Sequence, residues 1–226
     1  MKRSKSIEKR KNKLIEEKSE LLHNIDINER IKIHPLQFHN SRLIEFENVS
    51  LFYGNNKICE NINFVIKQGD RILLKGKNGS GKSSVLKLIL GENIKYGGYI
   101  YKAKNLKISY VQQNTSNLTG NIFDYINGKQ IDKTLFLSIL RKMDFSRLQF
   151  EKDIASFSEG QKKKILIATS LCEEAHLYIW DEPLNFIDIL SRIQIENLIL
   201  EYSPTLLFVE HDMAFSEKVA TKIICL

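Results

Sequence analysis

The sequence is poor in cysteine, proline and long apolar runs. Cys59, Cys172 and Cys225 are scattered along the 226 residues, without the C-x-x-C spacing of a zinc or redox site. We therefore expect reduced thiols, as in cytosolic proteins. No apolar run reaches the roughly 20 residues of a membrane-spanning helix, and the charged N-terminus lacks the apolar core of a signal peptide. The sequence predicts a cytoplasmic chain with no membrane domain.

The positive charge is concentrated at the N-terminus. Residues 1–13 hold seven Lys or Arg and one Glu, which is most of the formal net charge of +7. Ile7, Leu14 and Leu21 recur every seven residues, and no proline or glycine precedes Pro35. This narrow stripe is typical of an exposed helix that pairs with another helix. We expect residues 1–41 to form a charged helical arm and linker. The charge indicates a nucleic acid or anionic membrane partner, and a merely solvated helix is the alternative.

A different pattern begins at Arg42 and predicts an α/β domain over residues 42–226. Strands are expected at 43–53, 58–66, 71–75, 99–101, 106–111, 177–180, 205–209 and 219–226. Helices are expected at 84–90, 187–201 and 212–220, with a largely helical stretch over 118–173. The short apolar strands after residue 176 are of the kind buried in a parallel sheet.

The most specific motif is the stretch from Gly76 to Ser83, which reads G-x-x-x-x-G-K-S. A short apolar strand precedes it and an apolar helical pattern follows, which is the context of a phosphate-binding loop rather than an ordinary Gly/Ser turn. Its glycines let backbone N–H groups point at a phosphate, and the new helix adds its positive end. Lys82 would contact the β- and γ-phosphates, and Ser83 would bind Mg²⁺. The residues assigned to the phosphates are Gly76, Asn78, Gly79, Ser80, Gly81, Lys82, Ser83 and Ser84.

Two further motifs fit nucleotide hydrolysis. The apolar strand at 177–180 ends in Asp181 and Glu182. A carboxylate at such a strand end can hold Mg²⁺, and a second one beside it can accept a proton from the attacking water. Ser158, Gly160 and Gln161 form a Ser-x-Gly-Gln turn that opens an apolar helix, which is a second anion site.

With these motifs in this order, the sequence resembles the ATP-binding cassette (ABC) superfamily across residues 42–226. The resemblance implies a phosphate-loop ABC fold with an antiparallel β part and a helical subdomain, and ATP and Mg²⁺ as ligands. Two cassettes would sandwich ATP, each signature loop completing the other's site. The resemblance assigns adenine stacking to Tyr53, Mg²⁺ and γ-phosphate sensing to Gln113, the signature loop to Ser158–Gln161, Mg²⁺ binding to Asp181, the general base to Glu182, a dimer contact to Asp188 and the switch histidine to His211. Glu159 departs from the usual glycine and adds a negative charge to the signature loop.

The stretches Glu159–Lys164 and Asp181–Asp188 are similar to the ABC-F family, in particular to its antibiotic-resistance, ribosome-protection members. Asn185 fits the family's Asp-Glu-Pro-Thr-Asn motif and Leu184 departs from it. ABC-F proteins have two cassettes joined by a charged helical linker, so the chain would be the second half, and the arm the end of that linker. The expected partners are a second cassette and ribosomal RNA. A fragment, a truncated gene and a chain with a separate partner remain open.

Two other functions stay open at this stage. The chain could be the ATPase subunit of a membrane transporter, although such subunits normally begin at the first strand rather than with a basic arm. It could also be a clamp that holds ATP and rarely hydrolyses it, although Glu182 favours hydrolysis.

Overall fold

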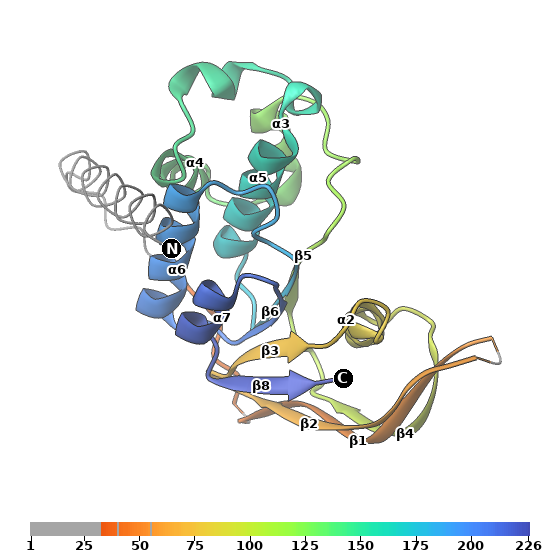
Figure 1. Cartoon of the computed structure of the whole chain (residues 1–226). Helices are drawn as coiled ribbons and strands as arrows, with labels where there is room; N and C mark the ends of the chain where they lie inside the picture. Colours follow the sequence, from red (N-terminus) through yellow and green to blue (C-terminus); the bar gives the residue numbers. More distant parts are fainter. Residues whose placement is uncertain (1–32, 40, 55) are drawn as a thin grey trace, which may run out of the picture.

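The computed structural model describes residues 33–39, 41–54 and 56–226 (Figure 1). The helix predicted over residues 2–25 lies outside these ranges. Residues 33–39, which were expected to be linker, run along the cassette. Ile33 is buried, the Leu36 N–H donates to the Ala175 carbonyl at 2.9 Å, and the Phe38 ring meets His176 edge-on at 5.0 Å. This part of the chain is therefore packed on the domain that follows it.

An antiparallel sheet forms the first layer, with strand order β2-β1-β4. It consists of β1 (Arg42–Tyr53), β2 (Asn56–Lys67) and β4 (Lys95–Lys102). The sequence predicted β4 only over 99–101, after Gly97-Gly98. The strand instead runs through both glycines, because Gly98 adopts φ +91° and forms a bulge against Asn48. A Cβ at Gly98 would lie 2.4 Å from the Asn48 carbonyl oxygen, so glycine is required there.

The second layer is a five-stranded sheet with order β5-β6-β7-β3-β8, in which all neighbouring strands are parallel. Its strands are β3 (Arg71–Lys75), β5 (Ile108–Val111), β6 (Leu177–Asp181), β7 (Leu206–Val209) and β8 (Lys222–Cys225). The predicted parallel α/β core is confirmed. The last strand is shorter than the predicted 219–226, because Val219 still belongs to the preceding helix.

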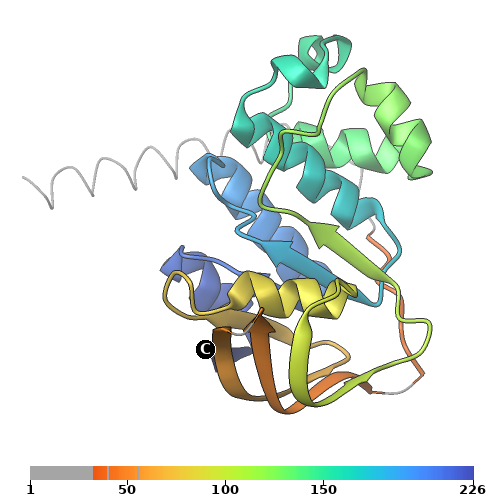
Figure 2. The same ribbon diagram turned by 90° about the vertical axis from the view of Figure 1, so that its right-hand side faces the viewer.

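Helices cover both faces of the parallel sheet (Figures 1 and 2). They are α2 (Lys82–Leu90), α5 (Glu159–Cys172), α6 (Ile189–Tyr202) and α7 (Met213–Val219). A helical part lies beyond one end of the sheet, with α3 (Ile122–Lys129), α4 (Lys133–Lys142) and the 3₁₀ turns η1 (Arg147–Glu151) and η2 (Ile154–Ser156). Residues 118–173 are largely helical, as predicted. They form several short helices, because the side chains of Asn121, Asp132 and Asp153 each accept a backbone N–H and start a new turn there.

The parallel sheet separates two apolar cores. Alternate residues along each strand point to opposite faces, and the central strands β6 and β7 are buried on both sides. One face packs on α2 and the antiparallel sheet, and its strand residues are Ile72, Leu74, Leu177, Ile179, Leu207 and Val209. The other face packs on the remaining helices through Leu73, Val111, Tyr178, Trp180, Leu206 and Phe208. Among the described residues, no helix has the length and apolarity needed to cross a membrane.

Candidate functional site

The phosphate loop connects β3 to α2, as predicted. Gly79 and Gly81 have φ of +80° and +96°, which glycine adopts at little cost, and Gly81 is the N-cap of α2. A Cβ on Gly81 would lie 2.8 Å from Cys59 Sγ, so the loop also packs tightly on β2. The Lys82 ammonium is almost fully buried and donates to the carbonyls of Gly76 at 2.9 Å and Lys77 at 3.0 Å. The lysine is therefore held inside the curl of the loop.

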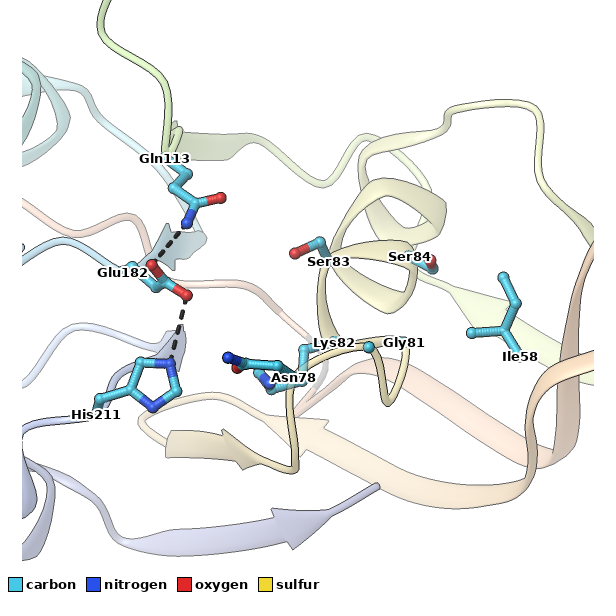
Figure 3. Close-up of a pocket in the computed structure, with 10 residues that line it drawn as sticks. Ile58, Asn78, Gly81, Lys82, Ser83, Ser84, Gln113, Glu182 and His211 are labelled. Carbon is cyan, nitrogen blue, oxygen red and sulfur yellow. Dashed lines mark hydrogen bonds and ion pairs between the residues drawn. The ribbon is translucent and has the colours of Figure 1, made fainter.

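A pocket of about 750 Å³ opens beside this loop, at the carboxyl ends of the parallel strands (Figure 3). Such strand ends are where open α/β sheets bind their ligands. The pocket brings together residues from the phosphate loop, the segment after β5, the end of β6 and the segment after β7. Its lining residues are Ile58, Asn78, Gly79, Gly81, Lys82, Ser83, Ser84, Gln113, Glu182 and His211.

The Glu182 carboxylate lies opposite the phosphate loop and is held by three side chains. Oε2 accepts from Gln113 Nε2 at 2.6 Å and from Asn185 Nδ2 at 2.6 Å, and Oε1 lies 3.4 Å from His211 Nε2 (Figure 3). Glu182 has φ +48°, and its N–H donates to the Val209 carbonyl at 3.0 Å. The turn after β6 is thus anchored to β7. This geometry fixes a half-buried carboxylate at the edge of the pocket.

Asp181 lies deeper than Glu182, at the end of β6. It is buried, and its carboxylate is hydrogen-bonded with Ser83. Burial, together with the negative charge of Glu182, raises the pKa of Asp181, while Lys163 and Lys82 oppose this shift. A bound cation would stabilise the ionised carboxylate of Asp181 and oppose this rise in its pKa. In Figure 3 the Gln113 amide oxygen and the Ser83 hydroxyl point toward each other. Ser83, Asp181 and Gln113 therefore offer the oxygen donors that Mg²⁺ prefers.

The predicted signature residues lie at the start of α5 and do not line this pocket. Ser158 caps the helix: its hydroxyl accepts from the Gln161 N–H at 3.3 Å, and the Gln161 side chain accepts from the Ser158 N–H at 2.9 Å. Gly160 lies against the loop before α6, where a Cβ would lie 2.3 Å from the Phe186 carbonyl oxygen. The Glu159 carboxylate, which departs from the usual glycine, accepts a hydrogen bond from the Thr115 hydroxyl. Its charge is thereby engaged within the chain.

Besides Asp181, four other predicted residues also lie outside the pocket lining. Tyr53 ends β1 and is 56% exposed. Gly76 and Ser80 face each other within the loop, where a Cβ on Gly76 would lie 2.4 Å from Ser80 Oγ. Asp188 caps α6 through the Ser191 N–H and forms an ion pair with Lys164 at 2.7 Å. The structure therefore gives Asp188 and the signature residues internal partners.

The sequence analysis assigned no function at the site to three residues that lie near it. Ile58 lines the pocket from β2, and Asn185 supports Glu182. Lys163 is buried between the segment after β5 and the end of β6. Ile58 gave no signal, because it is one apolar residue in an alternating strand. Lys163 gave a weak one, since a lysine on the inner face of an apolar helix breaks the amphipathic pattern.

The sequence matches several known proteins. The ATP-binding protein Uup of Buchnera aphidicola subsp. Schizaphis graminum is 32% identical over 80% of this chain and 32% of its own length. The ribosome protection protein VmlR of Bacillus subtilis is 32% identical over 78% of this chain and 33% of its own. The zinc import ATP-binding protein ZnuC of Wolbachia pipientis wMel is 31% identical over 86% of this chain and 83% of its own. The chain thus spans about a third of Uup and VmlR and most of ZnuC.

Solved structures agree on the fold. The ATP-binding subunit of an ABC transporter matches with a TM-score of 0.67 at 24% identity, over 81% of this chain and 85% of that one. The archaeal ribosome recycling factor aABCE1, solved with the stalk protein aP1, matches with a TM-score of 0.68 at 21% identity, over 88% of this chain and 39% of that one. The profile of the family described as ABC transporter matches residues 59–185, more than half of the chain. The chain therefore belongs to the ABC family of ATP-binding cassettes, which are ATPases.

Proposed function

We propose that this cassette binds Mg-ATP in the pocket beside the phosphate loop and hydrolyses it with Glu182 as general base. The observation that carries the proposal is the Glu182 carboxylate, held by Gln113, Asn185 and His211 at the wall opposite that loop. A base must be fixed within hydrogen-bond reach of the water that it activates. Three partners on this half-buried carboxylate supply that fixation.

The remaining roles follow from the positions of the side chains. The loop N–H groups and Lys82 bind the phosphates, and Ser83, Asp181 and Gln113 hold Mg²⁺. When bound, the ion supplies positive charge to the phosphate oxygens. Glu182 takes a proton from the attacking water, and His211 contacts the γ-phosphate. The exposed Tyr53 ring stacks on adenine at the open side of the site.

A second cassette completes the site in this proposal. Ser158, Gly160 and Gln161 lie outside the pocket of their own chain, and they start a helix whose N-terminal end attracts anions. They would contact the γ-phosphate of ATP held by the partner. Asp188 is the N-cap of α6 and would contact the partner at that end of the helix. ABC cassettes act in pairs, which agrees with this arrangement.

We further propose that the chain is half of an ABC-F protein that protects the ribosome against antibiotics, and that it acts in the cytoplasm. The similarity to VmlR supports this role, and so does Asn185 in the turn after Glu182. The seven basic residues of positions 1–13 would contact ribosomal RNA, whose phosphates attract such a segment. The chain spans a third of VmlR, as expected for one of two cassettes with its linker.

A transporter ATPase is the second candidate, because this chain covers 83% of ZnuC at 31% identity. Co-sedimentation separates the two functions. The full chain is pelleted with ribosomes at low and high salt, with anionic vesicles as the parallel sample. One test variant replaces the seven basic residues of positions 1–13 with glutamine, and a second lacks residues 1–25.

For an ABC-F protein we expect ribosome binding that falls steeply with added salt and is weakened in both variants. ATP binding should be retained in both, because the phosphate loop lies outside the arm. Pelleting with vesicles, or with the membrane part of a transporter, and never with ribosomes would refute the ABC-F assignment and favour the transporter subunit.

A further inference from the structure

The inner face of α5 carries a lysine where an apolar residue would be expected. Lys163 is 2% exposed, and its ammonium donates to the Gln112 carbonyl at 2.7 Å and lies 3.4 Å from the Asp181 carbonyl. The two carbonyls belong to different segments, one after β5 and one at the end of β6. A single side chain therefore connects three elements: α5, β6 and the segment that carries Gln113.

Burying an ammonium group is costly, so a buried lysine needs compensation. Burial lowers the pKa of Lys163, and the nearby carboxylates of Asp181, Glu182, Glu210 and Glu159 oppose this shift. All four lie around the nucleotide pocket or at the start of α5. A buried charge is retained where its removal would leave other charges and carbonyls unpaired. Lys163 has such partners, and they belong to the motifs of the site.

The two carbonyls that Lys163 contacts each precede a residue of the pocket. Gln112 precedes Gln113, which donates to Glu182 at 2.6 Å, and Asp181 precedes Glu182 itself. We propose that Lys163 is a positioning residue that fixes the backbone on both sides of the Gln113–Glu182 pair, so that the amide of Gln113 meets the nucleotide and its metal in a defined place. Lys163 touches neither the pocket nor the nucleotide and acts through Gln113.

A second contact from α5 reaches the same segment. The hydroxyl of Thr115, which is 1% exposed, is hydrogen-bonded to the Glu159 carboxylate in the first turn of α5. The segment 112–115 is thus held by α5 near both of its ends. Glu159, which replaces the usual glycine of the signature loop, has its charge used in this contact.

A double-mutant cycle tests the proposal, which rests on the proposed role of Gln113 at the nucleotide. Lys163→Met and Gln113→Ala are made singly and together in the full chain, and Mg-ATP and Mg-ADP affinities are measured by calorimetry. We expect Lys163→Met to weaken Mg-ATP binding about tenfold, or roughly 1.4 kcal/mol, and Mg-ADP by less than about twofold, because the phosphate loop is unchanged. In the Gln113→Ala background, Lys163→Met should cost less than about twofold, since residues that act through one another are not additive.

The controls separate positioning from support of the fold. Lys163→Arg keeps the charge and the donors, and should stay within about twofold of the parent. Lys102→Met removes an ammonium that donates to the Ile89 carbonyl at 2.8 Å, from an exposed residue outside the pocket lining, and should leave both affinities unchanged. If circular dichroism shows that Lys163→Met does not fold, Lys163→Gln replaces it, because its amide nitrogen is one atom too short for both carbonyls.

Two outcomes for Lys163→Met overturn the proposal. One is an equal loss of Mg-ATP affinity in both Gln113 backgrounds, which would make Lys163 a structural residue. The other is no loss from Lys163→Met. If Gln113→Ala alone leaves Mg-ATP binding unchanged, the proposed role of Gln113 is wrong and the role of Lys163 falls with it. A parent chain that fails to bind Mg-ATP at all would instead refute the proposed function itself.

Discussion

Replacing Glu182 with glutamine removes a proton acceptor and leaves its shape. The carboxylate accepts two amide hydrogen bonds at Oε2, from Gln113 and Asn185, and faces His211 at Oε1. A glutamine can keep its carbonyl oxygen toward the two amides and turn its NH₂ group toward His211, whose neutral ring nitrogen can accept. We therefore expect the pocket of Glu182→Gln to keep its geometry while losing the base.

The size of the effect follows from the role. Loss of a positioned general base typically lowers the rate by about 10²–10⁴, which is roughly 2.7–5.4 kcal/mol in the activation free energy. The affinity for Mg-ATP should be kept or increased, because one negative charge near the bound phosphates is removed. A lower kcat without a weaker affinity is the expected signature.

The assay measures phosphate release with a second cassette present, and ATP affinity by calorimetry on the same protein. Glu217→Gln, on an exposed position of α7, is the matched control for the change in charge and should behave as the parent. A variant at position 182 that turns over ATP at the parental rate would show that Glu182 is not the base. Equal loss of turnover and of binding would instead indicate that the glutamine had disturbed the pocket.

Three further predictions concern the loop, the signature turn and the buried carboxylate. Lys82→Ala should abolish measurable Mg-ATP binding in calorimetry with the fold intact by circular dichroism, and unchanged affinity would refute the loop assignment. Gly160→Ala should lower the free energy of unfolding by about 1–3 kcal/mol, and so lower Tm, because its Cβ would lie 2.3 Å from the Phe186 carbonyl oxygen. Gly128→Ala, which has open space around it, should leave Tm unchanged. The raised pKa of Asp181 means that its ionised form destabilises the folded state, and that protonation stabilises the fold as pH falls through that pKa. Asp181→Asn should therefore raise Tm in the absence of nucleotide. It should also lose the additional rise in Tm that Mg²⁺ gives over ATP alone.

The sequence was sufficient to predict the parallel sheet and the position of the phosphate loop. Strands such as Leu206–Val209 are apolar throughout because both faces are buried, and the motif from Gly76 to Ser83 has one structural context. It failed at places where a local feature has two interpretations. Gly97-Gly98 was taken to precede β4, whereas it forms a bulge inside the strand. The helical character of residues 118–173 was predicted, but their division into separate helices was not.

The sequence indicated candidate residues for the site, but not which of them form hydrogen bonds with one another. The sequence could place Glu182 after a strand, but its bonds to Gln113 and Asn185 depend on how the segments after β5 and β6 meet. The contacts of Glu159 with Thr115 and of Lys163 with the Gln112 carbonyl connect residues about 50 positions apart. A single sequence carries no record of such pairings. The roles assigned to all the site residues stay predictions.

The order of strands in the parallel sheet has a consequence for how the chain folds during synthesis. β3, which leads into the phosphate loop, lies between β7 and β8, the last two strands to be made. The Arg71 N–H at the start of β3 is bonded to Thr221 Oγ1, 150 residues later in the chain. Until those residues leave the ribosome, β3 has no partner in its sheet, and closing so long a loop is slow. The nascent cassette therefore exposes an unpaired apolar strand for most of its synthesis, and its nucleotide site is among the last parts to form.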